Sequence, residues 1–352
     1  GRPHHTSRRA PRLADMVSVA GGEALGRAAE ALRASVGERV RPGEPLGSRT
    51  TYRVGGPAAW WFEVEDEDDL RAVHDALHVA AAPVPVLVVG KGSNLLVADA
   101  GFPGLVLAPG AAMTWVTVDG AVVRAGGATG YPVVARRSAA AGLRGLEWAV
   151  GVPGSVGGAL RMNAGGHGSD TAAVLARYRV FDLATGAGRD CAADEFRASY
   201  RRSSVEAADV VVWAEFALEP GDADAAQRAL SEVVRWRRAH QPGGSNAGSV
   251  FTNPAEGPAG LLIEQAGLKG RRLGTAEVSP KHANFIQADE GGSADDVRRL
   301  IDLVRDTVAE RTGVTLVPEL RMVGFPDTEL PFVESAGAFG DERTSSSGGG
   351  RG

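Results

Sequence analysis

Residues 245–254, "SNAGSVFTNP", place one serine, Ser249, between turn-forming glycine and asparagine residues. Two further polar side chains, Thr252 and Asn253, follow in the same stretch. A buried strand favours an unbroken apolar run or strict alternation, and this stretch has neither pattern. The stretch therefore indicates a functional site, although a turn hydroxyl without a function is also consistent with these residues alone.

A first glycine-rich loop occupies residues 90–94 within "VLVVGKGSNLLVAD". Glycine lets the backbone approach a phosphate closely, and successive N–H groups in such a turn can form an anion-binding nest. The loop is not a Walker loop, which needs four residues between its first glycine and Gly-Lys. It is not a Rossmann fingerprint either, because a β-rich run rather than a helix follows it. A purely structural hairpin is the alternative.

A second glycine-rich loop occupies residues 151–170, "GVPGSVGGALRMNAGGHGSD", with seven glycines. Such a density favours a tight multi-turn path or direct contact between the backbone and a ligand. Together the two loops indicate a diphosphate cofactor held outside a Rossmann fold. His167 in the second loop could be a ligand or a covalent attachment point, but a loop histidine that simply hydrogen-bonds is the expected role.

The composition excludes several classes of protein. The chain has 352 residues, 38 basic against 43 acidic side chains and a net charge of −5, which gives no electrostatic argument for a nucleic-acid partner. No apolar run approaches the ~20 residues that span a bilayer, so membrane insertion is not expected. The single cysteine, Cys191, excludes an intrachain disulfide and any multi-cysteine metal site. A reducing, cytoplasmic location is expected.

The two ends of the chain are not expected to carry chemistry. The first fifteen residues are basic and contain no apolar segment of the secretory type. We expect residues 1–22 to be a disordered extension, with a transit peptide as the alternative. The last residues are a low-complexity run of serine and glycine, and residues 326–352 are expected to form a flexible tail.

The elements between the ends predict an α+β protein. Residues 23–218 are expected to form two α+β units divided near residue 109, and residues 219–325 a smaller third unit. Apolar residues at helical spacing or in β-rich runs give the expected elements. Helices are predicted over residues 24–36, 66–82, 131–142, 226–240 and 293–313, with Ser293 as a cap. Strands are predicted over residues 58–65, 85–89, 105–108, 114–127, 210–220 and 315–324.

Taken in order, several short motifs resemble one known family. They are "TTYRVGGPA", "GKGSNLLVAD", "GVPGSVGGALRMNAGGHG", "YRRS", "NAGSVFTNP", "AGLKG", "VSPKHANF" and "PELRMVG", and they cover about residues 50–324. The chain resembles the UDP-N-acetylenolpyruvoylglucosamine reductases (MurB) of bacterial peptidoglycan synthesis. The resemblance implies a two-part FAD-binding region of the vanillyl-alcohol-oxidase type, followed by a smaller α+β substrate-binding domain.

The resemblance also implies a reaction. In this family NADPH reduces a non-covalent FAD, and the flavin then delivers hydride to UDP-N-acetylglucosamine enolpyruvate, which gives UDP-N-acetylmuramate. Backbone amides of the two glycine loops would hold the FAD diphosphate. The cofactor residues that the resemblance implies are Gly90, Lys91, Gly92, Ser93, Asn94, Leu95, Gly154, Ser155, Gly157, Gly158, Asn163 and Arg321.

Three catalytic residues follow from the same resemblance. Ser249 matches the family's proton donor, Arg201 in "YRRS" its enolate-stabilising arginine, and Glu319 in "PEL" the partner acid. An enolate needs a cation or donor aimed at its charge and an acid within reach of its carbon. Without the resemblance, Arg201 is a solvated charge beside Arg202 and Glu319 a surface carboxylate at a strand end.

The substrate's diphosphate and sugar are expected to contact a further set of residues: Tyr200, Arg235, Arg238, Asn253 and His282. Arg235 and Arg238 are three residues apart in a predicted helix, so both lie on one face, where they could clamp a diphosphate. A solvated basic helix end is the alternative. Tyr200 and Arg321 could also lie next to the flavin. No metal site is expected.

Two departures limit what the resemblance implies. The interval from Arg201 to Ser249 is short, as in the family branch that lacks an inserted tyrosine loop over the substrate. "LVPEL" stands where "LEPEV" is commoner, which keeps the acid and changes its neighbour. Two other functions stay open: an alcohol or sugar oxidase on the same FAD scaffold, and a flavin- or UDP-sugar-binding protein without turnover. A monomer is expected.

Overall fold

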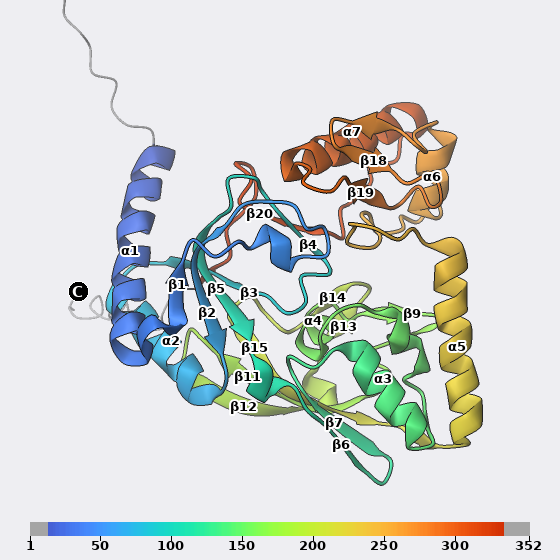
Figure 1. Cartoon of the computed structure of the whole chain (residues 1–352), viewed down its shortest axis with the longest axis horizontal. Helices are drawn as coiled ribbons and strands as arrows, with labels where there is room; N and C mark the ends of the chain where they lie inside the picture. The colour runs from blue at the N-terminus through green and yellow to red at the C-terminus, as the bar shows by residue number, and fades with distance from the viewer. Residues whose placement is uncertain (1–12, 334–352) are drawn as a thin grey trace, which may run out of the picture.

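The computed structural model describes residues 13–333, with side chains from residue 21 onward. The described chain forms three units around a common centre (Figure 1). The blue and cyan elements form the first unit, the green elements the second and the orange elements the third. The buried side chains gather in several cores, and the core of the third unit also takes in Tyr52, Val54, Leu96 and Ala98 of the first.

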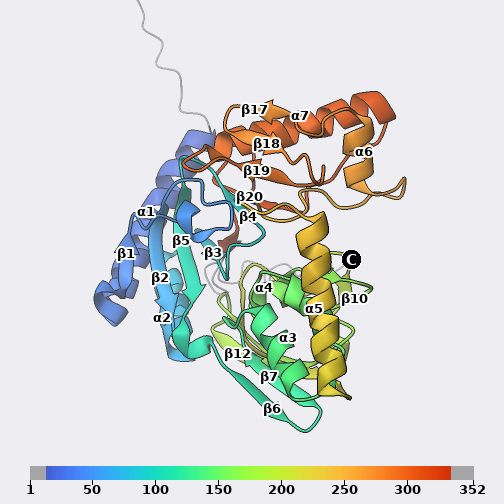
Figure 2. The same cartoon turned by 45° about the vertical axis from the view of Figure 1, so that its right-hand side comes forward.

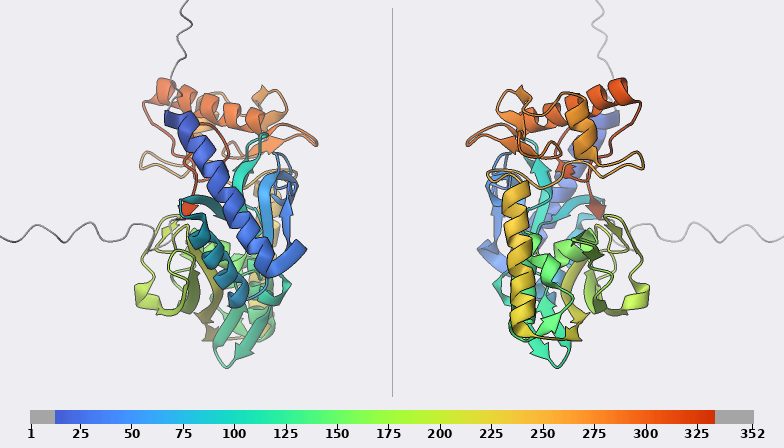
Figure 3. Two further views of the ribbon diagram at one scale, coloured as in Figure 1. Left: turned by 90° about the vertical axis from the view of Figure 1, so that its left-hand side faces the viewer. Right: turned by 90° about the vertical axis from the view of Figure 1, so that its right-hand side faces the viewer.

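The first unit is a mixed sheet with the strand order β1-β2-β5-β3-β21. Its three central strands are parallel, and the two edge strands are antiparallel to them. Helices α1 and α2 pack together along one side of this unit (Figure 3). The elements are α1 (Leu13–Val36), β1 (Val40–Pro42), β2 (Ala58–Val64), α2 (Glu67–Ala80), β3 (Val84–Val88), β4 (Leu95–Val97), β5 (Phe102–Pro109) and β21 (Phe332–Val333).

Local sequence explains these elements. Strand β2 is buried on both faces, with Phe62 in the core under the helices and Trp61 in the core on the opposite side. Parallel strands covered on both faces have such nearly continuous apolar runs. Helix α2 begins after Asp66, whose side chain accepts from the Asp69 N–H, and ends at Ala81 in a left-handed conformation. The strand and helix predicted here are confirmed.

The second unit is an antiparallel sheet with the order β12-β11-β15-β7-β6. Helices α3 and α5 run side by side over it (Figure 2). Tyr131, Trp148 and Phe216 pack with their ring centroids 5.7 and 5.8 Å apart in its core. The elements are β6 (Val116–Asp119), β7 (Val122–Gly126), α3 (Tyr131–Ala140), β8 (Leu143–Arg144), α4 (Val156–Arg161), β9 (Gly165–Gly166), β10 (Ser169–Asp170), β11 (Leu175–Asp182), β12 (Ala187–Ala192), β13 (Ala198–Ser199), β14 (Arg202–Ser203), β15 (Asp209–Ala217), β16 (Glu219–Pro220) and α5 (Ala223–His240).

Helix α5 corrects the expected domain boundary. The sequence placed this helix in the third unit, after residue 218. Ala226, Leu230 and Val233 instead belong to the core of the second unit. Figure 3 shows α5 running along the second unit and ending close to the third. The turn before the helix marks a change of direction within one unit, and only packing shows which core the apolar stripe joins.

The third unit is a small sheet with the order β17-β18-β19, covered by two helices. Helix α7 is capped as predicted, because the Ser293 side chain accepts from the Asp296 N–H and Gly313 follows with a φ of +74°. The elements are α6 (Ala259–Gln265), β17 (Arg272–Leu273), β18 (Ala276–Val278), β19 (Ile286–Ala288), α7 (Ala294–Thr312) and β20 (Arg321–Val323).

A strand pairing and a helix cap are among the contacts that fasten the third unit to the first. Strand β20 pairs in parallel with β4, so that Arg321 lies opposite Leu95. The Asp99 carboxylate accepts from the Ala294 N–H at 2.8 Å and from the Ser293 hydroxyl, at the start of α7. A carboxylate at a helix N-terminus satisfies free N–H groups and favours the helix dipole. Asp99 therefore links the segment after the first glycine loop to α7.

Both ends of the described chain contain more regular structure than the sequence predicts. Residues 13–22 are helical as part of α1, although they were expected to be disordered. Gly21 and Gly22 lower helix propensity by about 1 kcal/mol each, but no proline interrupts the helix. Residues 1–12 lie outside the described residues.

The expected tail is also ordered in part. Phe332 and Val333 pair with Pro85 and Val84 at the edge of the first sheet, so residues 326–333 are not a free tail. Residues 334–352 lie outside the described residues. The last strand predicted, residues 315–324, is shorter than expected and reduced to β20. Pro318 has no N–H for a ladder, and the N–H groups of Glu319 and Leu320 both donate to the Val250 carbonyl.

Candidate functional site

The two glycine loops lie against each other. A Cβ placed on Gly90 would overlap the Ser155 hydroxyl, and one on Gly154 would lie 3.3 Å from the Ser93 hydroxyl. Loop one comes from the first unit and loop two from the second, more than fifty residues apart. Glycine is required where two backbones approach this closely. The loops therefore form one feature at the boundary between the two units.

The first loop is not a hairpin. Strand β3 before it pairs with β5, whereas β4 after it pairs with β20. Gly92 has a φ of +59°, and its carbonyl accepts from the Thr51 N–H at 3.1 Å. The N–H groups of residues 91–94 donate to no carbonyl elsewhere in the described chain. A row of free amides around a left-handed residue is the arrangement of an anion-binding nest.

The second loop leads into the short helix α4. The Ser155 hydroxyl caps it by accepting from the Gly158 N–H at 3.2 Å, and the Gly157 N–H donates to the Gly127 carbonyl at 2.9 Å. The amides of Gly157 and Gly158 are thus used within the protein, while Ser155 and Gly154 face the first loop. A tight multi-turn path or direct contact with a ligand was expected here, and the helix was not predicted.

Arg201 lies at the tip of the hairpin formed by β13 and β14. Its φ is +59°, a left-handed conformation that is uncommon for residues other than glycine and asparagine. Its Nε donates to the Glu319 Oε1 at 2.8 Å, and its Nη2 donates to the Gly165 carbonyl at 3.2 Å. The arginine side chain therefore joins the second loop to the third unit.

Glu319 is held in place from several directions. The Asn94 side chain donates to the Glu319 carbonyl at 3.2 Å, and the Glu319 N–H donates to the Val250 carbonyl at 2.8 Å. The side chain is 14% exposed. Burial raises the pKa of its carboxyl above the ordinary value, and the charge and hydrogen bond of Arg201 partly oppose that rise. Glu319 thus connects the first glycine loop, Arg201 and the turn that carries Ser249.

Ser249 is half-buried directly before Val250, the residue whose carbonyl accepts from Glu319. Two asparagines hold its turn. The Asn246 side chain accepts from the Gly248 N–H at 3.0 Å, and the Asn284 side chain bonds both backbone groups of Phe251. Both amides are engaged with the backbone, which leaves the serine hydroxyl for other partners. The three catalytic residues expected from the sequence thus come from segments that are bonded to each other.

Tyr200, next to Arg201 on the hairpin, is 55% exposed. The Arg201 guanidinium carbon lies 5.0 Å from the centroid of its ring, within cation–π range. Tyr200 therefore presents an exposed aromatic ring beside the Arg201–Glu319 ion pair. The interval between residues 201 and 249 is too short for an inserted tyrosine loop.

Arg235 and Arg238 both lie exposed near the end of α5. The Arg238 carbonyl accepts from the Lys281 side chain at 2.6 Å, which brings a third cation to this end of the helix. Neither guanidinium forms an ion pair within the described chain. Both guanidinium groups are exposed to solvent, and an anion could bind to either of them.

Arg237, which sequence analysis did not select, faces inward. A Cβ on Gly151 of the second loop would lie 3.0 Å from the Arg237 Cδ. Burial lowers the pKa of its guanidinium. A signal was present in the sequence: Arg237 follows the buried residues Leu230 and Val233 by seven and four positions, so the apolar stripe of α5 already pointed to it.

Asn253 and His282 have local structural partners. The Asn253 side chain accepts from the Ala259 N–H at 3.0 Å at the start of α6. His282 Nδ1 accepts from the Asn284 N–H at 3.2 Å, which leaves its proton on Nε2. Burial lowers the pKa of His282, so the ring favours the neutral form. The donors left for a substrate are the Nδ2 group of Asn253 and the Nε2 group of His282.

Among the expected cofactor residues, Asn163 has no spare side-chain group. Its Nδ2 donates to Asp170 and to the Ser199 carbonyl, and its Oδ1 accepts from the Ala172 N–H. Arg321 is exposed, and its N–H donates to the Asn94 carbonyl at 3.2 Å. Lys91 is exposed and Leu95 is buried at the start of β4.

His167 lies in an aromatic cluster on the surface. Its ring is 5.1 Å from that of Trp236 on α5, in an edge-to-face arrangement, and Trp236 stacks on His240 at 4.6 Å. The φ of His167 is +52°. The cluster fastens the β9–β10 hairpin to α5.

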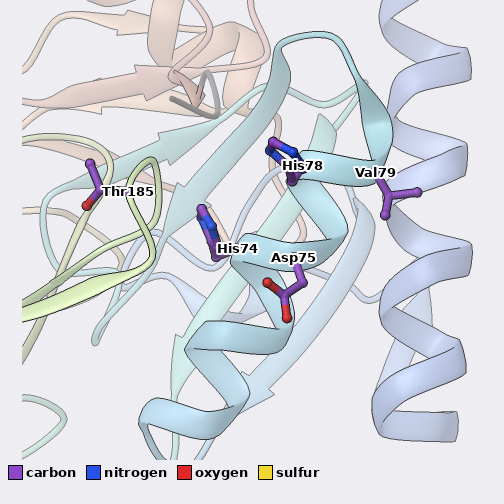
Figure 4. A pocket seen from close by; sticks show the side chains of 5 residues that line it. All are labelled: His74, Asp75, His78, Val79 and Thr185. Atoms are coloured by element: carbon purple, nitrogen blue, oxygen red, sulfur yellow. The ribbon is translucent and has the colours of Figure 1, made fainter. Parts of the chain in front are cut away.

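A separate cavity of about 420 Å³ lies on the outside of α2. It is lined by His74, Asp75, His78 and Val79 of α2 and by Thr185 on a separate loop, which are labelled in Figure 4. None of them belongs to the glycine loops or the Arg201 region. Within residues 13–333, no group of three or more His, Cys, Asp or Glu side chains is placed to hold a metal ion. No helix in that part of the chain is long and apolar enough to cross a membrane.

Comparisons with known proteins agree with this arrangement. Residues 58–192 match the FAD binding domain family, and residues 240–323 match the C-terminal domain of UDP-N-acetylenolpyruvoylglucosamine reductase. A UDP-N-acetylenolpyruvoylglucosamine reductase 2 from Symbiobacterium thermophilum is 43% identical over 302 residues, which cover 84% of this chain and 96% of that protein. The chain belongs to the UDP-N-acetylenolpyruvoylglucosamine reductase family. The resemblance inferred from its motifs is confirmed.

Other members of the family give the same picture. A UDP-N-acetylenolpyruvoylglucosamine reductase from Synechococcus sp. (strain WH7803) is 45% identical over 291 residues, covering 80% of this chain and 92% of the relative. The crystal structure of the MurB enzyme from Thermus caldophilus superposes with a TM-score of 0.70 at 34% identity, covering 81% of this chain and 99% of that one. The predicted fold class, an FAD-binding region followed by a smaller α+β domain, is confirmed.

The two family matches also concern the boundary between the second and third units and the identity of the cofactor. The match to the MurB C-terminal domain begins at residue 240, where α5 ends, in agreement with the packing of α5 on the second unit. The FAD-binding domain spans both glycine loops. The free amides of residues 91–94 fit the negative charge of a diphosphate, so the residues present suit FAD.

Proposed function

We propose that this chain catalyses the NADPH-dependent, FAD-mediated reduction of UDP-N-acetylglucosamine enolpyruvate to UDP-N-acetylmuramate, a step of peptidoglycan precursor synthesis. The observation that carries the proposal is the ion pair of Arg201 and Glu319, bonded through the backbone to the Ser249 turn and to the first glycine loop. A guanidinium paired with a carboxyl, bonded to the segment that carries a serine hydroxyl, matches the needs of an enolate.

FAD held by the two glycine loops would supply the hydride for the vinyl terminus of the substrate, with NADPH as the source of reducing equivalents. Negative charge then develops on the carboxylate-bearing end of the enolpyruvyl group. Arg201 carries the permanent positive charge that stabilises this enolate, and Glu319 holds the guanidinium in a fixed orientation. The side chain of Arg201 is 24% exposed, so its interaction with the developing charge is less screened than at an open surface.

Ser249 donates the proton that completes the reaction. An alcohol is a weak acid, but a carbon with enolate character is basic enough to take its proton if the geometry is fixed. The backbone bonds of Asn246 and Asn284 fix the turn in this way.

The substrate's diphosphate is bound by the cationic end of α5. Arg235 and Arg238 are exposed there, Lys281 bonds the Arg238 carbonyl, and Arg237 contacts the second glycine loop. Guanidinium groups suit phosphate oxygens because they donate in pairs. Tyr200 and Asn253 then contact the sugar or the enolpyruvyl group, with His282 behind them as a neutral donor.

The cofactor contacts come from the two glycine loops. The amides of residues 91–94 bind the FAD diphosphate, and Gly154 and Ser155 close the site from the other side. Asn163 shapes the second loop through its bonded side chain. We also propose that the enzyme works as a monomer in the cytoplasm, since one chain supplies all three catalytic side chains and its substrates are nucleotides.

The test is a pair of half-reactions. Purified enzyme with a flavin absorbance spectrum is bleached anaerobically with NADPH and then mixed with UDP-N-acetylglucosamine enolpyruvate. Rapid return of the oxidised spectrum with this sugar, and not with UDP-N-acetylglucosamine, supports the proposal. If the reduced flavin is reoxidised only by oxygen, or the bleaching agent is an alcohol or sugar, the chain is an oxidase and the proposal is wrong.

A further inference from the structure

Arg201 occupies a backbone position that normally excludes arginine. In the two-residue loop between β13 and β14 it is the second residue and has a φ of +59°. Turns of this kind favour glycine or asparagine there, because other side chains are strained in the left-handed region. Such a conformation persists only where the surroundings hold it. The hairpin itself has two ladder pairs, Ala198 with Ser203 and Ser199 with Arg202, which is little support.

The missing support comes from residues 161–165, which lie within the second glycine loop. Before the tip, the Asn163 side chain donates to the Ser199 carbonyl at 3.2 Å. After the tip, the Ser203 hydroxyl donates to the Arg161 carbonyl at 3.1 Å, and Arg161 Nη1 donates to the Val205 carbonyl at 2.6 Å. Both flanks of the hairpin are thus bonded to one segment.

An arginine at position 161 lowers the stability of the fold. It ends helix α4 and is half-buried, and its acceptor is a backbone carbonyl instead of a carboxylate. Burial first, and then the nearby charge of Arg321, lower the pKa of its guanidinium. A buried cation without a paired anion costs stability. An apolar side chain would be less costly here. We therefore infer that the guanidinium serves to orient Val205 and strand β14 before it.

We propose that Arg161 is a positioning residue for Arg201: it holds the β13–β14 hairpin so that the strained arginine at the tip keeps its guanidinium on Glu319. This inference rests on the proposed function, in which Arg201 stabilises the enolate. It also couples two sites, because α4 is capped by Ser155 in the cofactor loop and ends at Arg161 in the hairpin clamp.

The experiment compares the two half-reactions in flavin-loaded Arg161→Met, which keeps the length and loses the donors. Reoxidation by the enolpyruvyl substrate is expected to slow by roughly 10–100-fold, since small misplacements of a catalytic group have effects of this size. Bleaching by NADPH should stay within about twofold. Arg161→Lys should restore part of the lost rate because an ammonium can still donate to the Val205 carbonyl. Arg202→Met is the matched control: it removes an exposed guanidinium from the same hairpin and should alter neither step.

A double variant separates positioning from general damage. Because Arg161 acts through Arg201, Arg161→Met combined with Arg201→Ala should be no slower in reoxidation than Arg201→Ala alone. If the two losses multiply, Arg161 has a separate role and the inference is wrong. It is equally wrong if Arg161→Met reoxidises at the wild-type rate.

Two further measurements cover the case in which Arg161→Met loses flavin or folds poorly. Ser203→Ala removes the other side-chain bond of the clamp and should slow the same half-reaction alone. Amide hydrogen exchange of residues 198–205 should be faster in either variant than in wild type, and unchanged exchange in both would contradict the clamp. If wild type itself is not reoxidised by the sugar, the proposed function fails, and the exchange result still decides whether Arg161 holds the hairpin.

Discussion

The Arg201 Nε donates to the Glu319 Oε1 at 2.8 Å, between residues separated by 118 positions in the chain. The pair joins the second unit to the third across the glycine loops. Its side chains are 24% and 14% exposed, so neither charge is free in solvent. Removing one partner would leave the other buried without compensation. The position and charge state of this pair are the basis of most of the following predictions.

Replacing Ser249 by alanine should separate the two half-reactions. We expect NADPH to bleach the flavin of Ser249→Ala at close to the wild-type rate, while reoxidation by the enolpyruvyl substrate falls by at least about 100-fold, the scale of a lost general acid. Stopped-flow absorbance follows both steps. Ser245→Ala, in the same turn, is the control and should behave as wild type. An equal loss in both half-reactions would contradict the proton-donor role.

The backbone strain at Arg201 should be measurable as stability. Both Arg201→Ala and Arg201→Gly remove the ion pair, but only glycine adopts a φ of +59° without strain. Arg201→Gly should therefore be about 1–2 kcal/mol more stable than Arg201→Ala. Urea unfolding of the two variants measures the difference. Equal midpoints for the two would show that the tip is not strained.

The rate of reoxidation should fall in acid because of Glu319. Burial raises the pKa of this carboxyl above its ordinary value, so the group takes up a proton at a higher pH than a free glutamate does. As the pH falls through the raised pKa, the carboxylate becomes neutral and Arg201 loses its charged acceptor. The pH profile of the reoxidation step should show this acidic limb, and the limb should be absent from the slower Glu319→Gln enzyme. If the acidic limb of the pH profile persists in Glu319→Gln, it comes from another titrating group and the prediction is wrong.

A side chain at Gly90 should impair FAD binding. The added Cβ of Gly90→Ala would overlap the Ser155 hydroxyl, which caps α4, so one loop must move away from the other. We expect the dissociation constant of FAD to rise by at least about tenfold, equivalent to 1.4 kcal/mol. Flavin fluorescence titration of the apoprotein measures it. Gly166→Ala, where nothing lies within 4 Å of the new Cβ, should bind as wild type.

The contact between Asp99 and α7 should contribute to stability. Asp99 accepts from the Ala294 N–H and the Ser293 hydroxyl, so Asp99→Ala leaves helix N–H groups without an acceptor. We expect a loss of about 1–2 kcal/mol, as for other helix caps. Chemical denaturation measures it, with the exposed Asp119→Ala as the control. A loss no larger than that of the control would show that the third unit does not depend on this contact.

The sequence by itself determined the features that depend on nearby residues. The cap at Ser293, the periodicity of α2 and α7 and the density of glycines are each encoded by residues close together in the chain, so turn chemistry and spacing predict them. The order of the motifs also identified the family, because their residue types are specific. The three residues proposed to be catalytic were selected through this resemblance, because no pattern near Arg201 or Glu319 distinguishes them from solvated charges.

Tertiary structure decided what depends on segments far apart. The first glycine loop is a nest and not a hairpin because β4 pairs with β20, more than two hundred residues later. Helix α5 joins the second core and turns Arg237 inward because its apolar stripe meets α3, which no local pattern specifies. The left-handed backbone of Arg201 is held by Arg161, Asn163 and Ser203. Local propensity opposes that conformation, and only long-range hydrogen bonds can stabilise it.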